Sequence, residues 1–180
     1  MLDVLFLTLI NLTKRKGNLK MKQTSTHAQA AKLIRQFLKA NNIDGRVTSN
    51  SYSMGNSINV RVADLDPTRY EIVKLFAAQF EYGSFNGMTD CYEYDNKNDD
   101  IPQVKFVFVN NEMSNEVGQD VWDFARRYFS GMNFAPSDYA NAGSFYINGF
   151  DMYGNQLVWK LYSGQFLGYW EFKGNLQKAA

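Results

Sequence analysis

The sequence predicts an α+β domain in which an antiparallel sheet packs against three helices, in the order α-β-β-α-β-β-α. Three amphipathic stretches that follow helix-capping residues predict the helices, and runs with apolar residues at every second position predict the strands. An aromatic-rich stretch with spaced glycines then predicts a C-terminal β meander. We expect the α+β domain to occupy residues 21–135 and the β extension, packed on it, residues 136–180.

The first helix is predicted from Thr26 to about residue 40. Thr26, with Gln29 three residues later, resembles a capping box. The apolar side chains share one face and the basic ones lie elsewhere, as an amphipathic core helix requires. This apolar face comprises Ala30, Ile34, Phe37 and Leu38.

Two strands and a second helix follow. "IDGRVTSNSY" is a polar strand, residues 54–56 form a hairpin turn, and "SINVRVAD" alternates cleanly. Asp66 then caps a helix that has Pro67 in its first turn and runs to about residue 81. The side chains expected to face the core from these elements are Ile58, Val60, Val62, Val73, Phe76 and Phe80.

The stretch "GSFNGMTDCYEY", residues 83–94, is the part of the chain that most resembles a site. We interpret it as a helix-to-strand connection, in which Gly83 and Gly87 adopt conformations that other residues disfavour. In this interpretation Phe85 and Met88 are buried.

The strand that ends this stretch carries the acidic and aromatic side chains. Asp90, Tyr92 and Tyr94 fall on one side of it and Glu93 on the other, which makes Asp90 and Glu93 poor candidates for a catalytic carboxylate pair. A calcium loop is not expected either, because Lys97 occupies a ligand position.

A buried strand and a third helix complete the predicted domain. "QVKFVFVN" is apolar on both faces and predicts a central strand. Ser114 caps the helix, and Ser130 with Gly131 ends it.

Composition limits the chemistry. The single cysteine excludes an internal disulfide framework, and the single histidine excludes a multi-histidine metal site, so we expect neither a metal nor a cofactor. The net charge of +1 gives no overall attraction to nucleic acid or membrane. The charge is uneven, however: residues 1–46 hold nine basic and two acidic side chains, and residues 64–101 hold nine acidic and three basic ones.

The first twenty residues differ from the rest. Their apolar run is too short to span a bilayer, and a basic run follows it instead of preceding it as in a secretory signal. We expect translation to begin at Met21, so that residues 1–20 are not part of the natural protein. The alternative is a short disordered or amphipathic tail.

Residues 28–114 resemble a known family, the large polyvalent protein-associated domain of type 29. The resemblance rests on "AAKLIRQFLKANNIDGRVTSNSYSMGNSINVRVADLDPTRYEIVKLF", "GSFNGMTDCYEY" and "VKFVFVNNEMS". The second of these carries the most specific pattern, G-x-F-[DN]-G-M-x-D-x-Y-E-Y, and Asn86 is a departure where Asp is usual. Such domains occur in bacteriophages and conjugative elements, so the resemblance implies an accessory protein of a mobile element, at work in the host cytoplasm, with a role against host defences or in establishment. It implies no catalytic residues.

The C-terminal third is predicted to supply a binding surface. Residues 139–172 hold eleven of the 28 aromatic residues and only three charges. The aromatic residues either pack against the main domain or form an interface, and the scarcity of lysine and arginine favours a protein partner over nucleic acid. The candidates for binding a host protein are Tyr162, Phe166, Trp170, Asp90, Tyr92 and Tyr94.

Two other classes of function stay open. A nucleic-acid-binding accessory protein would use Lys32, Arg35, Lys39 and Arg46, with weak affinity because of the acidic middle of the chain. An enzyme would be built around Asp90 and Glu93, against which the scarcity of histidine and the missing nucleotide-binding glycine loop both count.

Overall fold

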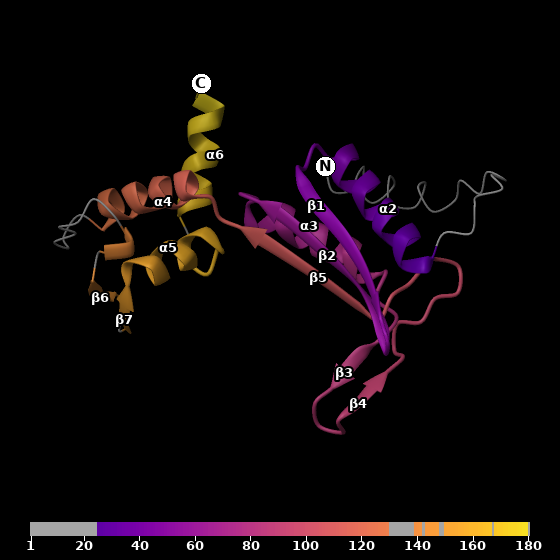
Figure 1. Cartoon of the computed structure of the whole chain (residues 1–180). Helices are drawn as coiled ribbons and strands as arrows, with labels where there is room; N and C mark the ends of the chain where they lie inside the picture. Colours follow the sequence, from indigo (N-terminus) through magenta and orange to yellow (C-terminus); the bar gives the residue numbers. More distant parts are fainter. Residues whose placement is uncertain (1–24, 130–138, 142, 148–149, 167, 180) are drawn as a thin grey trace. The chain divides into compact units, whose positions relative to one another are not determined.

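Helices and short strands alternate along the part of the chain that the computed structural model describes, residues 25–129, 139–141, 143–147, 150–166 and 168–179 (Figure 1). The helices are α2 (Thr26–Ala40), α3 (Pro67–Ala78), α4 (Asn115–Tyr128), α5 (Gly154–Tyr162) and α6 (Tyr169–Ala179), with a 3₁₀ turn η1 (Tyr139–Asn141). The strands are β1 (Gly45–Tyr52), β2 (Gly55–Ala63), β3 (Ser84–Asn86), β4 (Cys91–Glu93), β5 (Phe106–Glu112), β6 (Ser144–Ile147) and β7 (Phe150–Tyr153). Within these residues, no helix is long and apolar enough to cross a membrane.

The described elements group into two compact units. The first comprises residues 25–42, Arg46–Val60 and Phe76–Phe108. The second comprises Ile43–Gly45, Arg61–Leu75 and the chain from Val109 onward. The unit boundaries fall within β1, β2, α3 and β5, so these elements contribute to both units. The expected start at Met21, the tail over residues 1–20 and the expected boundary at residues 135–136 lie outside the described residues.

Helix α2 begins where the sequence predicts, but its cap differs. Ser25 is the capping residue, and its side chain makes no capping hydrogen bond, so the capping box predicted for Thr26 and Gln29 is wrong. Thr26 already has helical backbone angles, which prevents it from serving as the cap. The predicted apolar face is confirmed: Ala30, Ile34, Phe37 and Leu38 are all buried.

The main sheet has three strands in the order β1-β2-β5. Strands β2 and β5 run in the same direction, because Lys105 N donates to Asn56 Oδ1 near the start of both strands, and Asp64 N donates to Glu112 O near their end. The sheet is therefore mixed, and the predicted antiparallel sheet is corrected. The physical reason is the crossover through α3, since a strand that follows a helical crossover can pair in parallel. In the order β1-β2-β5 the strand β5 lies at an edge, so the prediction of a central strand for "QVKFVFVN" is also wrong.

The core of the first unit consists of interlocked aromatic and aliphatic side chains. Phe37 of α2 stacks on Phe76 of α3 with ring centroids 3.8 Å apart, and Phe76 meets Phe80 edge-on at 5.5 Å. Ile58 and Val60 of β2 are completely buried. Burying such side chains contributes about 1.5–3 kcal/mol each. The set predicted to face the core is confirmed as buried.

Residues 83–94 form a separate antiparallel hairpin, in which β3 pairs with β4 (Figure 1). The prediction that Phe85 and Met88 are buried is wrong, because the hairpin leaves them 59% and 96% exposed. Neither Gly83 nor Gly87 has a positive φ; Asp90 has one instead, at 55°. Gly83 is required for another reason: a Cβ there would overlap the carbonyl oxygen of Glu93.

The second unit is built on α4. Its cap is confirmed, because Ser114 Oγ accepts a 3.2 Å hydrogen bond from Val117 N. The helix ends at Tyr128 and Phe129 N donates to Ala125 O, whereas the predicted end at Ser130 and Gly131 lies outside the described residues. The core around α4 consists of Val121, Trp122, Phe124, Ala125, Met152, Leu157, Val158, Leu161, Tyr162 and Tyr169.

The predicted C-terminal meander is wrong. A hairpin, β6 paired with β7, is followed by the two helices α5 and α6. The segment "QLVWKLY" lies in α5 and buries Leu157, Val158, Leu161 and Tyr162. That spacing, i, i+1, i+4 and i+5, is helical, so burial of one helical face prevails over the apparent alternation.

Candidate functional site

An aromatic surface covers the β3–β4 hairpin and the start of β5 in the first unit. We call it the hairpin surface. It comprises Tyr82, Phe85, Met88, Tyr92, Tyr94, Phe106 and Phe108. Five of its rings are linked by ring contacts. Tyr82 stacks on Tyr94 at 5.5 Å and meets Tyr92 edge-on. Tyr92 in turn meets Phe106 edge-on at 5.7 Å, and Phe106 stacks on Phe108. Rings held by one another present a rigid apolar surface.

Tyr92 anchors this surface to β5. Its hydroxyl donates a 2.6 Å hydrogen bond to the carbonyl oxygen of Lys105, and burial raises the pKa of the phenol well above its ordinary value. The Lys105 ammonium lies 5.0 Å from the centre of the same ring and 5.4 Å from that of Phe106. Of the sequence-predicted residues on the hairpin, Tyr92 is therefore the one that fixes its conformation.

The outer part of the hairpin combines apolar exposure with negative charge. Tyr94 is 67% exposed, and the side chains of Phe85 and Met88 are also mostly exposed. Three carboxylates accompany them: Asp90 in the turn, Glu93 and Asp95. Glu93 accepts a 2.6 Å hydrogen bond from Asn86 Nδ2, and Asp95 accepts a 2.7 Å hydrogen bond from Ser84 Oγ. The arrangement is suited to recognition of an apolar partner that carries positive charge.

An enzyme built on Asp90 and Glu93 gains no support from this geometry. Asp90 lies in the turn before β4, and the Glu93 carboxylate is engaged by Asn86. In the described part of the chain, no group of three or more His, Cys, Asp or Glu side chains is arranged to hold a metal ion. Both candidate carboxylates are exposed.

The four predicted basic residues are all exposed in the first unit. Lys32, Arg35 and Lys39 lie on α2, and Arg46 on β1. Arg35 donates a 2.7 Å hydrogen bond to the carbonyl oxygen of Val47, the residue after Arg46. That bond ties α2 to β1 and commits one of the four cations to a structural contact.

The predicted C-terminal candidates belong mostly to the core of the second unit. Tyr162 is 2% exposed and accepts, through its backbone oxygen, a 2.7 Å hydrogen bond from Trp170 Nε1. Its ring is therefore not available to a partner at the surface. Phe166 and Trp170 are half-buried, and the Lys160 ammonium lies 5.5 Å from the centre of the Phe166 ring.

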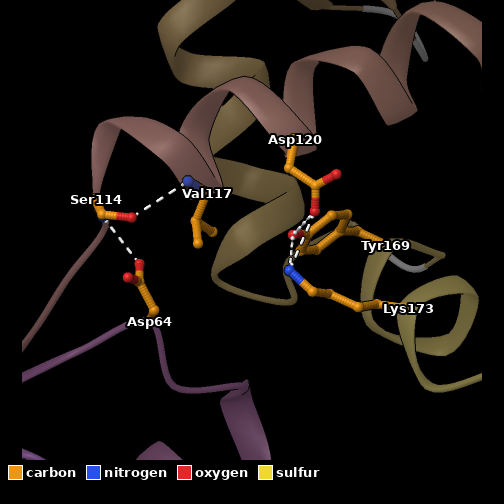
Figure 2. A network of polar contacts seen from close by, with 6 residues as sticks. All are labelled: Asp64, Ser114, Val117, Asp120, Tyr169 and Lys173. Atoms are coloured by element: carbon orange, nitrogen blue, oxygen red, sulfur yellow. Dashed lines mark hydrogen bonds and ion pairs between the residues drawn. The ribbon is translucent and has the colours of Figure 1, made fainter. Parts of the chain in front are cut away.

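Sequence reasoning missed a polar network that fixes α4 within the second unit (Figure 2). Near the start of the helix, Asp64 Oδ1 accepts a 2.9 Å hydrogen bond from Ser114 N. Farther along, Asp120 Oδ2 accepts from the Tyr169 hydroxyl at 2.9 Å and from Lys173 Nζ at 3.1 Å. The residues are far apart in sequence and of ordinary types, so no local motif could have revealed them.

Tyr169, Asp120 and Lys173 shift one another's pKa values. Burial raises the pKa of Tyr169 to about 12. For Asp120, desolvation opposes ionisation, but the hydrogen bonds from Lys173 and Tyr169 prevail and lower its pKa. The pKa of Lys173 is raised because its hydrogen bonds with Tyr169 and Asp120 outweigh its own desolvation. The network stabilises a charged pair and a neutral phenol, which is the signature of a structural contact.

No curated protein and no solved structure matches the chain. One family model matches, that of the large polyvalent protein associated domain 29, and the match covers residues 25–119, more than half of the chain. It includes all of α2 to β5, and with them the hairpin surface. The chain therefore belongs to the large polyvalent protein associated domain 29 family and is a protein associated with bacteriophages and other mobile elements.

Proposed function

We propose that this protein is an accessory protein of a bacteriophage or conjugative element and acts without catalysis, by binding a host protein through the hairpin surface. The observation that carries the proposal is the exposure of Phe85, Met88 and Tyr94 beside Asp90 and Glu93. Exposed apolar groups of this size mark interaction sites, and methionine and aromatic residues are enriched in protein interfaces.

The chemistry of the surface defines the partner. A central apolar patch supplies most of the binding energy on desolvation, whereas carboxylates at its rim steer a positively charged partner. The expected partner is therefore a host protein whose surface combines apolar and basic side chains. The setting of the family supports a role in counter-defence or in establishment of the element, in the cytoplasm of the host bacterium.

Affinity capture from a host lysate tests the proposal. The double variant Phe85→Ser/Met88→Ser removes two exposed apolar groups without touching a buried side chain. We expect it to lower capture of a basic host protein by about tenfold or more. Leu75→Ser is the matched control, since Leu75 is 67% exposed on α3, and it should leave capture unchanged. Equal loss in both variants, or no loss in either, would contradict the proposal.

Nucleic-acid binding through the basic residues is the second candidate function. The exposure of Lys32 and Lys39 on one helix favours it, whereas the carboxylates of the same unit oppose it. A contact with nucleic acid would weaken steeply as salt rises, because bound counterions are released. Capture that disappears after nuclease treatment and in Lys32→Gln/Lys39→Gln would support this candidate in place of the first.

A further inference from the structure

The second unit contains a groove of about 560 Å³ beside the exposed side of α5. Its walls include Trp159 and Phe166, and Met152, which is 3% exposed, contributes apolar surface. Trp159 is 47% exposed although it packs at 5.7 Å from the Tyr162 ring, so a large part of its indole stays available to a ligand. A groove of this volume falls in the range of small-molecule sites.

Three carboxamides line the same groove: Asn155, Gln156 and Gln165. The oxygen of each carboxamide accepts a hydrogen bond from another group of the protein. Asn155 Oδ1 accepts from Gln156 N, Gln156 Oε1 accepts from Tyr153 N, and Gln165 Oε1 accepts 3.2 Å from Lys160 Nζ. Their NH₂ groups are therefore what these carboxamides offer most readily to a ligand.

The two charged side chains of the groove differ in sign. Lys160 lies 5.5 Å from the centre of the Phe166 ring, which places an ammonium beside an aromatic wall, and Asp151 supplies a carboxylate. Three NH₂ groups and one ammonium make the lining rich in donors, with a single carboxylate as acceptor. A complementary ligand is flat, rich in acceptors, and carries one anionic group.

From this complementarity we propose that the groove binds an adenine mononucleotide. The base stacks on Trp159, a contact that contributes about 1–3 kcal/mol per base. The carboxamide NH₂ groups donate to ring nitrogens of adenine, such as N7, which are acceptors. The Lys160 ammonium holds the phosphate, and the Asp151 carboxylate accepts from the ribose hydroxyls.

Two other ligand classes fit the groove less well. A saccharide presents about as many donors as acceptors, and the lining offers it only one carboxylate to receive its donors. A nucleic-acid strand needs a row of cations along its backbone, whereas Lys160 is the one cation among the residues that line the groove. The groove lies in the second unit and the hairpin surface in the first, so this inference is independent of the proposed function.

Calorimetric titration of the full chain tests the proposal, with AMP, adenosine, ribose 5-phosphate and glucose as probes. We expect AMP to bind at least about tenfold tighter than ribose 5-phosphate, because the base supplies the stacking contact. Trp159→Ala should weaken AMP about tenfold or more. Tyr146→Ala is the control, since Tyr146 is 68% exposed on β6, is not part of the groove and should leave AMP binding unchanged.

A second variant separates the role of the cation from that of the ring. Lys160→Gln should abolish the preference for AMP over adenosine while leaving the affinity for adenosine unchanged. Melting curves of both variants establish that they fold. The proposal is overturned by the absence of saturable AMP binding, by glucose that binds as tightly as AMP, or by AMP binding that survives Trp159→Ala.

Discussion

The Tyr169 hydroxyl donates a 2.9 Å hydrogen bond to Asp120 Oδ2, and Lys173 Nζ lies 3.1 Å from each of these two oxygens. The phenol ring is 1% exposed, whereas the Asp120 side chain is 57% exposed. One contact therefore joins the core of the second unit to its surface. Because Asp120 and Tyr169 are 49 positions apart in sequence, the contact fixes α6 against α4.

Removing that hydroxyl should destabilise the second unit modestly. In Tyr169→Phe the ring still fills its core position, but Asp120 loses a hydrogen-bond donor. We expect a loss of about 0.5–1.5 kcal/mol in the free energy of unfolding, measured by urea denaturation. Tyr128→Phe is the matched control, because Tyr128 is 65% exposed, and it should change stability by less than about 0.5 kcal/mol.

The same phenol gives the protein a specific sensitivity to alkali. The pKa of Tyr169 is raised to about 12, whereas an unfolded tyrosine titrates near about 10. Between these values the folded state binds the proton more tightly, so stability is fully present below pH of about 10 and falls as pH rises toward about 12. Tyr169→Phe should lose less stability than the parent across this interval. Parallel losses would show that Tyr169 ionises as in the unfolded chain.

Gly83 is required by the close approach of Glu93 and not by a positive φ, and comparison with Gly87 tests this. A Cβ on Gly83 would overlap the carbonyl oxygen of Glu93, whereas a Cβ on Gly87 would meet no atom within 4 Å. Gly83→Ala should therefore cost about 1–3 kcal/mol by forcing the hairpin apart, and Gly87→Ala should be close to neutral. Thermal unfolding followed by circular dichroism compares the two. A larger loss at Gly87 would contradict the hairpin described above.

How much of this could be read from the sequence depends on the range of the interactions. The apolar face of α2, the buried side of β2 and the cap of α4 at Ser114 are set by periodicity and by local hydrogen bonding, and all three were predicted correctly. The direction of β5 relative to β2 depends on how the chain crosses between them, which no local pattern records. The sequence therefore predicted the elements of the family-matched region better than their pairing.

The candidate site shows the same limit. Tyr92 and Tyr94 were predicted to share one side of a strand, and both contribute to one aromatic cluster. Phe85 and Met88 were expected in the core because large apolar residues are usually buried. The hairpin β3–β4 leaves them exposed. This exposure depends on contacts between residues far apart in sequence, which no local pattern records. For Tyr162 the sequence leaves both core and interface open, and helix α5 places it in the buried face.

At the cap of α4, a local and a distant contact meet at one residue. Ser114 Oγ accepts from Val117 N at 3.2 Å, and Ser114 N donates to Asp64 Oδ1 at 2.9 Å. Ser114→Ala removes the first contact and keeps the second, because the backbone N–H remains. It should cost about 1 kcal/mol, the usual effect of losing a capping side chain.

Asp64→Ala removes the second contact and also places alanine at a φ of 55°, so it should cost more than Ser114→Ala. Asp64→Gly accepts that φ without strain and isolates the lost hydrogen bond, and urea denaturation of all three variants separates the two effects. A Ser114→Ala variant as stable as the parent would show that the capping hydroxyl does not stabilise α4.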